Sequence, residues 1–167
     1  MKPRTKKNLL AAFAGESQAH MKYAIFADAA KKEGFKNIAR LFTAISFAEL
    51  VHARNHFGAL YGENPTTENL QSAIEGETYE VKTMYPGFKA AAKKDKEADA
   101  IRSIHFALEA EKTHAKMYAD AKRSARAGKD ITVSSVYICP VCGHTVFGKA
   151  PDTCPVCGVK KSRFRKF

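Results

Sequence analysis

The sequence predicts a mainly helical protein, in which an antiparallel four-helix bundle is followed by a small domain of strands and loops. Helical periodicity runs through most of residues 6 to 127, two parts of this region repeat each other, and all four cysteines lie in the last 29 of 167 residues. Hydrophobic residues make up 45% and charged residues 27% of the chain, the balance of a globular protein. No apolar run approaches the ~20 residues that span a bilayer, so we expect a cytoplasmic protein without a membrane segment.

Three interruptions divide the helical region into four long helices. Gly34 ends the first helix, the run 62–65 ends the second, and residues 93–99 separate the third from the fourth. The fourth helix is predicted to stop near Gly128, because glycine readily adopts the left-handed conformation of a helix C-terminus. Short connections between long helices favour antiparallel neighbours, and therefore a bundle.

The pattern changes after the fourth helix. Apolar residues alternate with polar ones in the segment 131–138, as they would in a short strand. We therefore predict two domains, a helical domain at 1–130 and a cysteine domain at 135–167.

The helical domain contains an internal repeat of acidic and histidine residues. A Gly-Glu pair in the first helix recurs 61 residues later in the third, and the segment AELVHA in the second recurs 62 residues later as AEKTHA in the fourth. The acidic and histidine residues of these repeats are Glu16, Glu49, His52, Glu77, Glu111 and His114. Each helix pair thus contributes one Glu and then one ExxH, which indicates pseudo-twofold symmetry with a site on the axis.

All four of these glutamates fall within the apolar stripe of their helix, where a charge needs compensation. An isolated carboxylate in a core would cost many kcal/mol, or would take up a proton and become neutral. No Lys or Arg occupies these stripes, so we expect two metal ions to supply the positive charge. One Glu on each of two helices and ExxH on the other two is the di-iron or di-manganese arrangement of ferritin-like bundles. The alternative is that these residues are surface charges on helices whose apolar faces lie elsewhere.

Glu80, Tyr23 and Tyr85 are weaker candidates. Glu80 lies one turn beyond Glu77, where the first helix has alanine at the equivalent position. Glu80 would be a seventh ligand that exchanges with His52 on one ion, because ferric iron favours carboxylate oxygen over imidazole; a solvated surface residue is the alternative. The hydroxyls of Tyr23 and Tyr85 could hydrogen-bond to the ligands, and core packing is the alternative for both.

The segments YICPVCG and DTCPVCG place the cysteines in two matching CxxC knuckles. Each knuckle lets two thiolates bind one ion, and the glycine after it can take the positive φ that turns backbone N–H groups toward sulfur. Zinc and iron both accept four thiolates, with structural zinc the default from sulfur chemistry alone, and two redox-active dithiols are the alternative. The predicted ligands are Cys139, Cys142, Cys154 and Cys157. The small core around the ion is expected to consist of Tyr137, Phe147, Phe164 and Phe167.

Taken together, these motifs resemble the rubrerythrin family over essentially the whole chain. The resemblance rests on AFAGES with Tyr23 beyond it, AELVHA, IEGETYE followed by MYP, ALEAEKTHA and the paired CPVCG. It implies a ferritin-like di-iron domain followed by a rubredoxin-like domain that holds a third iron through the four cysteines. The di-iron ligands that it implies, which would also be the catalytic residues, are Glu16, Glu49, His52, Glu77, Glu80, Glu111 and His114.

The resemblance also implies an activity, that of a non-haem di-iron peroxidase which reduces hydrogen peroxide to water in oxidative-stress defence. The rubredoxin-type iron would relay single electrons from a donor protein, either a rubredoxin or a NAD(P)H-dependent reductase. One alternative is a ferroxidase or iron-storage protein of the ferritin type, against which the cysteine domain argues. Another is a zinc ribbon that binds nucleic acid, but no platform of interleaved aromatic and basic residues supports a nucleic-acid partner.

Charge and helix length bear on the partners of the chain. The formal net charge is +11, and residues 136–167 carry six Lys or Arg against one Asp, which suits either an acidic protein partner or simple solubility. At ~1.5 Å per residue the fourth helix extends about 24 Å beyond Glu111, which would carry the cysteine domain away from its own di-iron site. The linker could instead fold back onto its own chain, since eight extended residues reach ~27 Å. We nevertheless expect a homodimer or higher homo-oligomer, arranged head to tail, in which each cysteine domain serves the partner's site.

Overall fold

The computed structural model describes residues 1–167 and divides into two compact units, Met1–Asn64 and Pro65–Phe167. These units differ from the domains predicted at 1–130 and 135–167, and that division stays a prediction. None of the helices combines the length and apolar character needed to cross a membrane.

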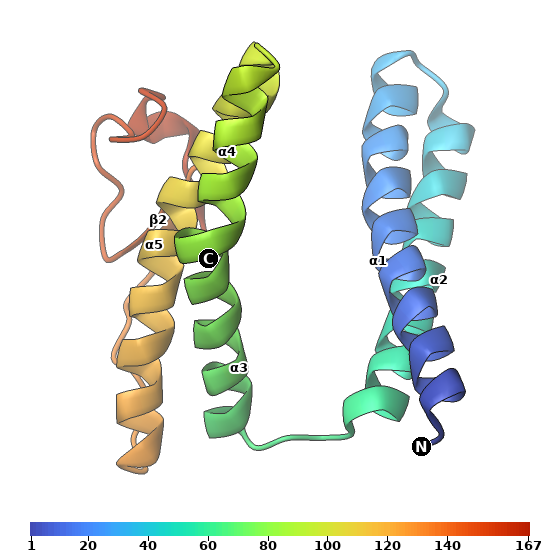
Figure 1. Ribbon diagram of the computed structural model, residues 1–167. Coiled ribbons are helices and arrows are strands. Elements are labelled where there is room, and N and C mark those ends of the chain that lie inside the picture. Colours follow the sequence, from blue (N-terminus) through green and yellow to red (C-terminus); the bar gives the residue numbers. More distant parts are fainter. The chain divides into compact units, whose positions relative to one another are not determined.

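The first unit is a pair of long helices, α1 (Pro3–Lys32) and α2 (Lys36–Tyr61), which run antiparallel (Figure 1). The predicted break between them is confirmed, because Gly34 has a φ of +89° and the Phe35 N–H returns to Ala30 O at 2.8 Å. Helix α2 ends at the next predicted break, where Gly62 also has a positive φ of 68°.

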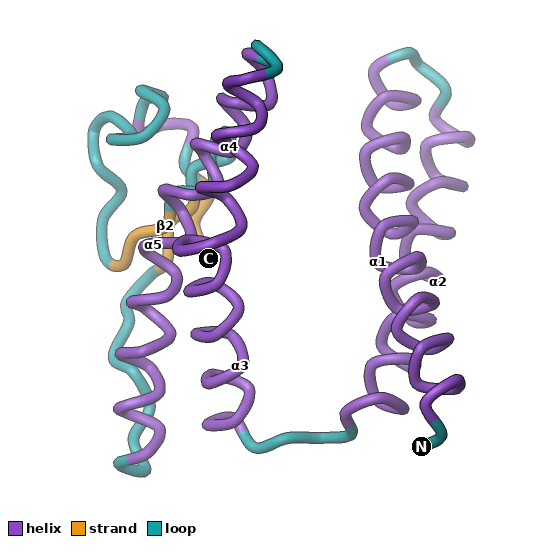
Figure 2. Tube along the Cα trace, viewed as in Figure 1, coloured by secondary structure: helices purple, strands orange, loops and turns teal.

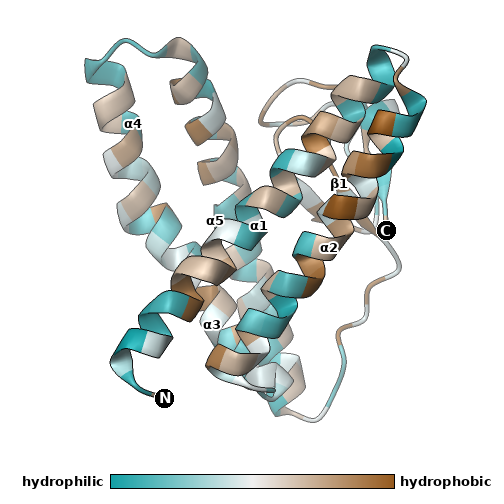
Figure 3. Cartoon of the chain, turned by 90° about the vertical axis from the view of Figure 1, so that its right-hand side faces the viewer, coloured by the Kyte–Doolittle hydropathy of each residue, from teal (hydrophilic) through white to brown (hydrophobic).

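Small residues bring α1 and α2 together. The buried residues of this pair are Ala27, Ala30, Ala39, Ser46 and Ala53. Larger apolar side chains remain on the surface of the unit, among them Leu41 at 61% and Phe47 at 62% exposure. Hydrophobic residues recur along both helices in Figure 3. Each helix pair therefore has apolar surface beyond its own contact, as expected of a bundle element.

The second unit begins with a long helical segment in three parts: α3 (Thr66–Tyr79), the π-helix η1 (Glu80–Met84) and α4 (Tyr85–Lys94). It packs against α5 (Ala98–Arg126), and Figure 2 shows the two as neighbouring helices. A local interruption is predicted from Pro86, whose ring would clash with a carbonyl in the preceding turn. The structure relieves this clash by widening that turn, so that the Tyr85 N–H bonds to Glu80 O, five residues back.

The C-terminal part of the second unit is a three-stranded antiparallel sheet. Its strands are β1 (Val136–Ile138), β2 (Thr145–Phe147) and β3 (Arg165–Lys166), in the order β2-β1-β3, with a 3₁₀ turn at Lys161–Arg163. The predicted class, mainly helical with a small β domain, is confirmed. The first strand is shorter than the predicted 131–138, because its partner β2 has only three residues and offers no ladder to the earlier ones.

The core of this small domain consists mainly of the cysteines. Cys139, Cys142 and Cys154 are buried, and Phe106 of α5 and Phe164 pack against them. Of the three phenylalanines predicted for this core, Phe164 is confirmed. Phe147 and Phe167 lie at the surface instead, at 40% and 64% exposure. Phe167 instead stacks against the guanidinium of Arg165, 5.5 Å from its ring centroid.

Candidate metal centres

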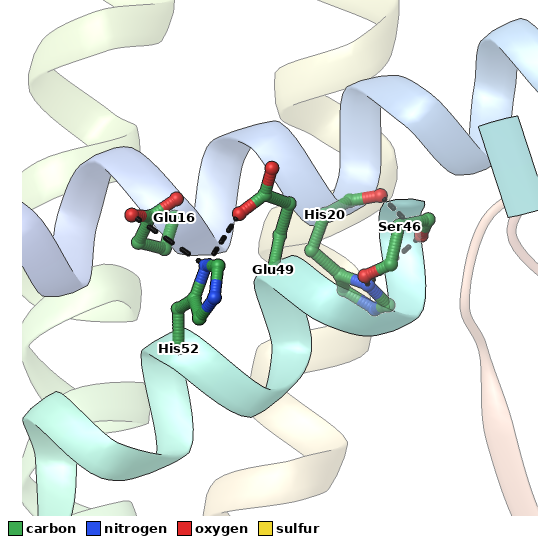
Figure 4. Close-up of polar contacts among 5 residues, drawn as sticks. All are labelled: Glu16, His20, Ser46, Glu49 and His52. Atoms are coloured by element: carbon green, nitrogen blue, oxygen red, sulfur yellow. Dashed lines mark hydrogen bonds and ion pairs between the residues drawn. The ribbon is translucent and has the colours of Figure 1, made fainter. Parts of the chain in front are cut away.

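Glu16, Glu49 and His52 form a cluster of metal-ligating side chains in the first unit (Figure 4). Glu16 comes from α1, and the ExxH pair places Glu49 and His52 one turn apart on α2. The ligand atoms of all three lie within 4.8 Å of one another. His52 Nδ1 is 2.9 Å from Glu49 Oε2 and 3.9 Å from Glu16 Oε1. The sequence therefore brings one Glu and one ExxH together, as the repeat predicts.

A pair of hydrogen bonds fixes α1 against α2 beside this cluster. His20 Nδ1 donates to Ser46 O at 2.8 Å, and Ser46 Oγ donates in return to His20 O at 2.8 Å (Figure 4). His20 lies one turn from Glu16, and Ser46 lies one turn from Glu49, so the pair sets the distance between the two carboxylates. Sequence reasoning missed Ser46, because a lone serine inside a helix carries no signal of a partner on another helix.

Glu77, Glu111 and His114 form a cluster of the same composition in the second unit. Glu77 comes from α3, and the ExxH pair comes from α5. The three ligand atoms again lie within 4.8 Å of one another, and His114 Nδ1 is 2.6 Å from Glu111 Oε2. His114 is more enclosed than its counterpart His52, with 27% against 53% of the side chain exposed. The cause is the sheet, which covers part of α5.

Glu77 of the second cluster, and Glu80 beside it, hold protons more tightly than glutamates in water. Burial raises the pKa of Glu77 to about 8, assisted by a hydrogen bond with Glu111 and by the negative charges of Glu111 and Glu80. Burial, and then the charge of Glu111, likewise raises the pKa of Glu80. Several acids at close range favour either shared protons or a bound cation, so the electrostatics fit a metal centre.

Glu80 and Tyr85 lie beside the second cluster without being part of it. Glu80 is the first residue of the π-helix η1 and is not among the three ligand atoms within 4.8 Å. Burial raises the pKa of Tyr85, and the charges of Glu80, Glu111 and Glu77 raise it further, which places its hydroxyl near all three. Single turns of π-helix occur frequently at functional sites. The roles of Glu80 as a ligand and of Tyr85 as a hydrogen-bond partner stay predictions.

Tyr23 takes part in an aromatic cluster of the first unit. Its ring centroid lies 6.2 Å from those of Phe26 and Phe42, and the rings of Phe26 and Phe42 are 5.6 Å apart. This packing joins α1 to α2 through contacts that favour tilted and edge-on rings. Within this unit Tyr23 is therefore placed by packing, and its predicted role beside the ligands stays a prediction.

The four cysteines meet at one point of the small domain. Cys139 Sγ lies 3.4 Å from Cys157 Sγ, Cys142 Sγ lies 3.5 Å from Cys154 Sγ, and all four are free thiols. An ion with bonds of about 2.3 Å to four sulfurs would separate them by somewhat under 4 Å, so the cradle has nearly the size of a tetrahedral thiolate site. Burial raises the pKa of the Cys142 thiol, and a metal ion would offset this cost of ionisation.

The knuckle geometry matches its prediction. Gly143 and Gly158 have φ values of 78° and 76°, and their N–H groups bond to Cys139 O and Cys154 O. These left-handed residues close each turn and let the chain wrap around the sulfurs. The donor set of four sulfurs suits zinc or iron, and the two clusters of two carboxylates and one imidazole suit iron or manganese among other ions.

The cysteine domain packs directly on α5, beside the second cluster. Thr145 Oγ1 of β2 lies 2.8 Å from His114 Nε2, and a Cβ added to Gly143 would lie 3.6 Å from Ala110 Cβ. The expectation that α5 carries this domain away from its own chain's ligands is therefore wrong. The linker after α5 reverses direction and runs back beside the helix (Figure 2). There Ile131 of the linker and Met117 of α5 line the same apolar cavity of about 450 Å³.

Comparison with known proteins places these features in one family. A family model described as "Rubrerythrin" matches residues 7–122, and one described as "Rubrerythrin, rubredoxin-like domain" matches residues 137–165. Rubrerythrin-2 of Clostridium acetobutylicum is 45% identical over 173 residues, which cover 95% of this chain and 94% of the relative. Nigerythrin of Nitratidesulfovibrio vulgaris is 34% identical, covering 98% and 86%. A solved structure of nigerythrin in a mixed-valence state matches with a TM-score of 0.57 at 34% identity, covering 98% of this chain and 86% of the other.

Both parts of the predicted order, a di-iron domain and then a rubredoxin-like domain, are thus matched along one polypeptide. The chain belongs to the rubrerythrin family, and its two Glu/Glu/His clusters and its four-cysteine cluster are those of a rubrerythrin-type di-iron site and a rubredoxin-like site.

Proposed function

We propose that this chain is a peroxidase that reduces hydrogen peroxide to water at a non-haem di-iron site, in defence against oxidative stress. One observation carries the proposal: a four-cysteine site, suited to single electrons, packs against the helix that bears Glu111 and His114 of a Glu/Glu/His cluster. When bound, the two irons would supply the electron pair that peroxide consumes: H₂O₂ + 2e⁻ + 2H⁺ gives 2H₂O. A ferritin-type store has no need of such a neighbouring electron carrier.

The proposed ligands come from both clusters and from Glu80. Each cluster supplies two carboxylates and one imidazole, which together balance much of the charge of one divalent ion. Glu80 is the seventh proposed ligand, because its carboxylate lies close enough to Glu111 to raise the pKa of Glu80. The ligand set is Glu16, Glu49, His52, Glu77, Glu80, Glu111 and His114. Tyr23 and Tyr85 are the proposed hydrogen-bonding hydroxyls around it.

Electrons would reach this site through an iron held by the four cysteines. Iron is proposed over zinc because the peroxidase cycle needs a one-electron carrier, and zinc has no redox chemistry. The ultimate reductant would be NAD(P)H, acting through a rubredoxin or a reductase. Four cysteines used as metal ligands rather than in disulfides suit a reducing compartment, and we propose that the protein acts in the cytoplasm.

Association with further copies of the chain belongs to the same proposal. Ile25 is 60%, Leu41 61% and Phe47 62% exposed on the first unit, and a bundle buries such apolar surface against further helices, from the same chain or from a second copy. We propose a homodimer or higher homo-oligomer. Because the cysteine domain packs on α5 of its own chain, each relay would serve the ligands of that same helix. Analytical ultracentrifugation tests the oligomeric state. A fully active protein that sediments as a monodisperse monomer would contradict the proposed oligomer.

Paired substitutions on α5 test the proposed site. Glu111→Gln removes a proposed ligand, whereas Glu109→Gln removes a neighbouring carboxylate that pairs with Lys112 at 2.7 Å. We expect Glu111→Gln to lose the iron outside the cysteine site and to lower peroxide reduction by about 100-fold or more. Glu109→Gln should keep both. Equal activity of the two variants would refute the assignment of this cluster.

Replacing Cys142 by serine tests the relay separately. The chemically reduced variant should complete one round of peroxide consumption and then stop, because the carboxylate site cannot be re-reduced. Sustained turnover with the donor protein would refute the relay. Iron storage would be indicated instead if both wild type and the Cys142→Ser variant oxidised ferrous iron into a stored mineral and neither reduced peroxide.

A further inference from the structure

Thr145 is a buried threonine that connects the two metal-ligating sites of the second unit. It is the first residue of β2, follows the first cysteine knuckle, and is 7% exposed. Its hydroxyl makes two hydrogen bonds, at 2.9 Å with Gly143 O and at 2.8 Å with His114 Nε2. A buried hydroxyl whose partners are a knuckle residue and a proposed metal ligand is placed to affect both sites.

Counting hydrogens fixes the direction of both bonds. A threonine hydroxyl has one hydrogen, and a backbone carbonyl can only accept, so Thr145 Oγ1 donates to Gly143 O. The hydroxyl oxygen must then accept the second bond, which means that His114 Nε2 carries a hydrogen and donates it. This assignment follows from the donors and acceptors present.

The consequence for His114 concerns its other nitrogen. With Nε2 committed to Thr145, the nitrogen left for a metal ion is Nδ1, which lies 2.6 Å from Glu111 Oε2 and within the ligand cluster. A ligating histidine is commonly oriented by a hydrogen bond from its second ring nitrogen, and that bond also increases the basicity of the ligand. In the first cluster, no hydrogen bond within the first unit reaches His52 Nε2, and the side chain is 53% exposed in that unit. The histidine of the second cluster is therefore held by a hydrogen bond within its own unit, and the histidine of the first cluster is not.

The same hydroxyl holds the cysteine domain in place. Gly143 directly follows the ligand candidate Cys142, and its carbonyl is the group that Thr145 engages. A hydrogen-bonded path from this knuckle to the second cluster therefore runs from Gly143 through Thr145 to His114. Ala110, at 3% exposure, closes the contact on the helix side.

We propose that Thr145 is a positioning residue of the second cluster: its hydroxyl directs Nδ1 of His114 toward the metal and ties that ligand to the cysteine knuckle. This inference rests on the proposed function, because it assumes that His114 is a ligand. The role belongs to the hydroxyl, so serine should replace threonine and the nearly isosteric valine should not.

The test uses the full iron-loaded chain and compares Thr145→Val with Thr145→Ser. The first readout is the removal of iron by a chelator, with the visible absorption of the cysteine-bound iron as an internal check that the small domain is intact. We expect Thr145→Val to release the other iron about 10- to 100-fold more readily than wild type, and Thr145→Ser to resemble wild type. Thr43→Val is the matched control, since it removes a hydroxyl that bonds only to Ala39 O within α2.

The second readout is the exchange of the His114 Nε2 hydrogen with water, followed by NMR on the zinc-substituted full chain. Loss of one hydrogen bond should speed this exchange about 10-fold in Thr145→Val and leave it slow in Thr145→Ser. Wild-type values of both readouts in Thr145→Val would overturn the proposal, as would a Thr145→Ser variant that behaves like the valine variant. If wild type itself binds no iron outside the cysteines, the proposed function fails instead.

Discussion

Raising the pH should destabilise the protein when its carboxylate site is free of metal, and Glu77 is the residue that identifies the cause. The pKa of Glu77 is about 8 in the folded chain against 4.5 for the unfolded residue. Between these two values the folded state binds more protons than the unfolded state, so the free energy of unfolding decreases as pH rises through this window. Full conversion of the shift would give about 5 kcal/mol, and solvent screening at a half-buried side chain reduces this to about 2 kcal/mol.

The measurement is urea unfolding of the chain after mild chelation, followed by helix circular dichroism at about pH 5 and about pH 8. Glu77→Gln removes the ionisable group, and Glu75→Gln on the same helix is the control, since its carboxylate bonds to Gln71 at the surface. We expect wild type and Glu75→Gln to lose about 2 kcal/mol more than Glu77→Gln over this range. Refilling the site with metal should abolish the difference, because the cation takes the place of the proton.

The comparison between variants guards against the titration of other groups. Titratable groups far from Glu77 change the stability of all three proteins alike, so the difference from Glu77→Gln reports on this site, including the neighbours Glu80 and Glu111. If the metal-free wild type and Glu77→Gln had parallel pH profiles, the electrostatic case for a cation between these carboxylates would be wrong.

Three further predictions concern the glycine turns, the helix contact and the donor surface. Gly143→Ala and Gly158→Ala should each lower the stability of the cysteine domain by about 1–2 kcal/mol, because both positions have a positive φ; thermal melts followed by the visible absorption of the domain measure this loss. The Cβ added at Gly143 would lie at an ordinary 3.6 Å from Ala110 Cβ, so a much larger loss in Gly143→Ala would contradict this reasoning. Ser46→Ala should cost about 1–2 kcal/mol in urea unfolding because it removes the buried hydroxyl that bonds from α2 to His20 O, whereas Ser17→Ala, whose hydroxyl bonds within α1, should be nearly neutral. Reduction of the cysteine iron by an acidic donor protein should slow several-fold in stopped-flow experiments between low and physiological salt, and a salt-independent rate would exclude the basic C-terminal segment as the docking surface.

The helix breaks and the ligand groups could be predicted because local chemistry determines them. Gly34, Gly62 and Gly128 all adopt the positive φ that ends a helix, and no distant contact is needed to choose these positions. The repeat likewise predicts which Glu joins which ExxH motif. Within each motif, the Glu and the His must share a face because they are one turn apart on their helix. Both clusters of three ligand atoms were predictable for this reason.

Features that depend on packing could not be predicted in the same way. Pro86 predicts that the third helix is disturbed, but the proline itself does not say whether the helix ends, kinks or widens. The structure widens it over Glu80–Met84, which moves the disturbance to the turn that begins with Glu80. Ser46 and Thr145 were missed because a hydroxyl becomes informative only when the chain brings an acceptor to it.

The reversal of the chain after α5 has the largest consequence for function. Helix length alone predicts a cysteine domain far from Glu111, because it ignores where the linker finds apolar contacts. Phe106, Ala110 and His114 follow one another at intervals of four residues, so they form one face of α5, and each touches the cysteine domain. Glu111 lies on the adjacent face with the carboxylates. His114 stands at the border, with Nδ1 near Glu111 and Nε2 near Thr145, so a single helix positions both the proposed ligands and the four-cysteine site.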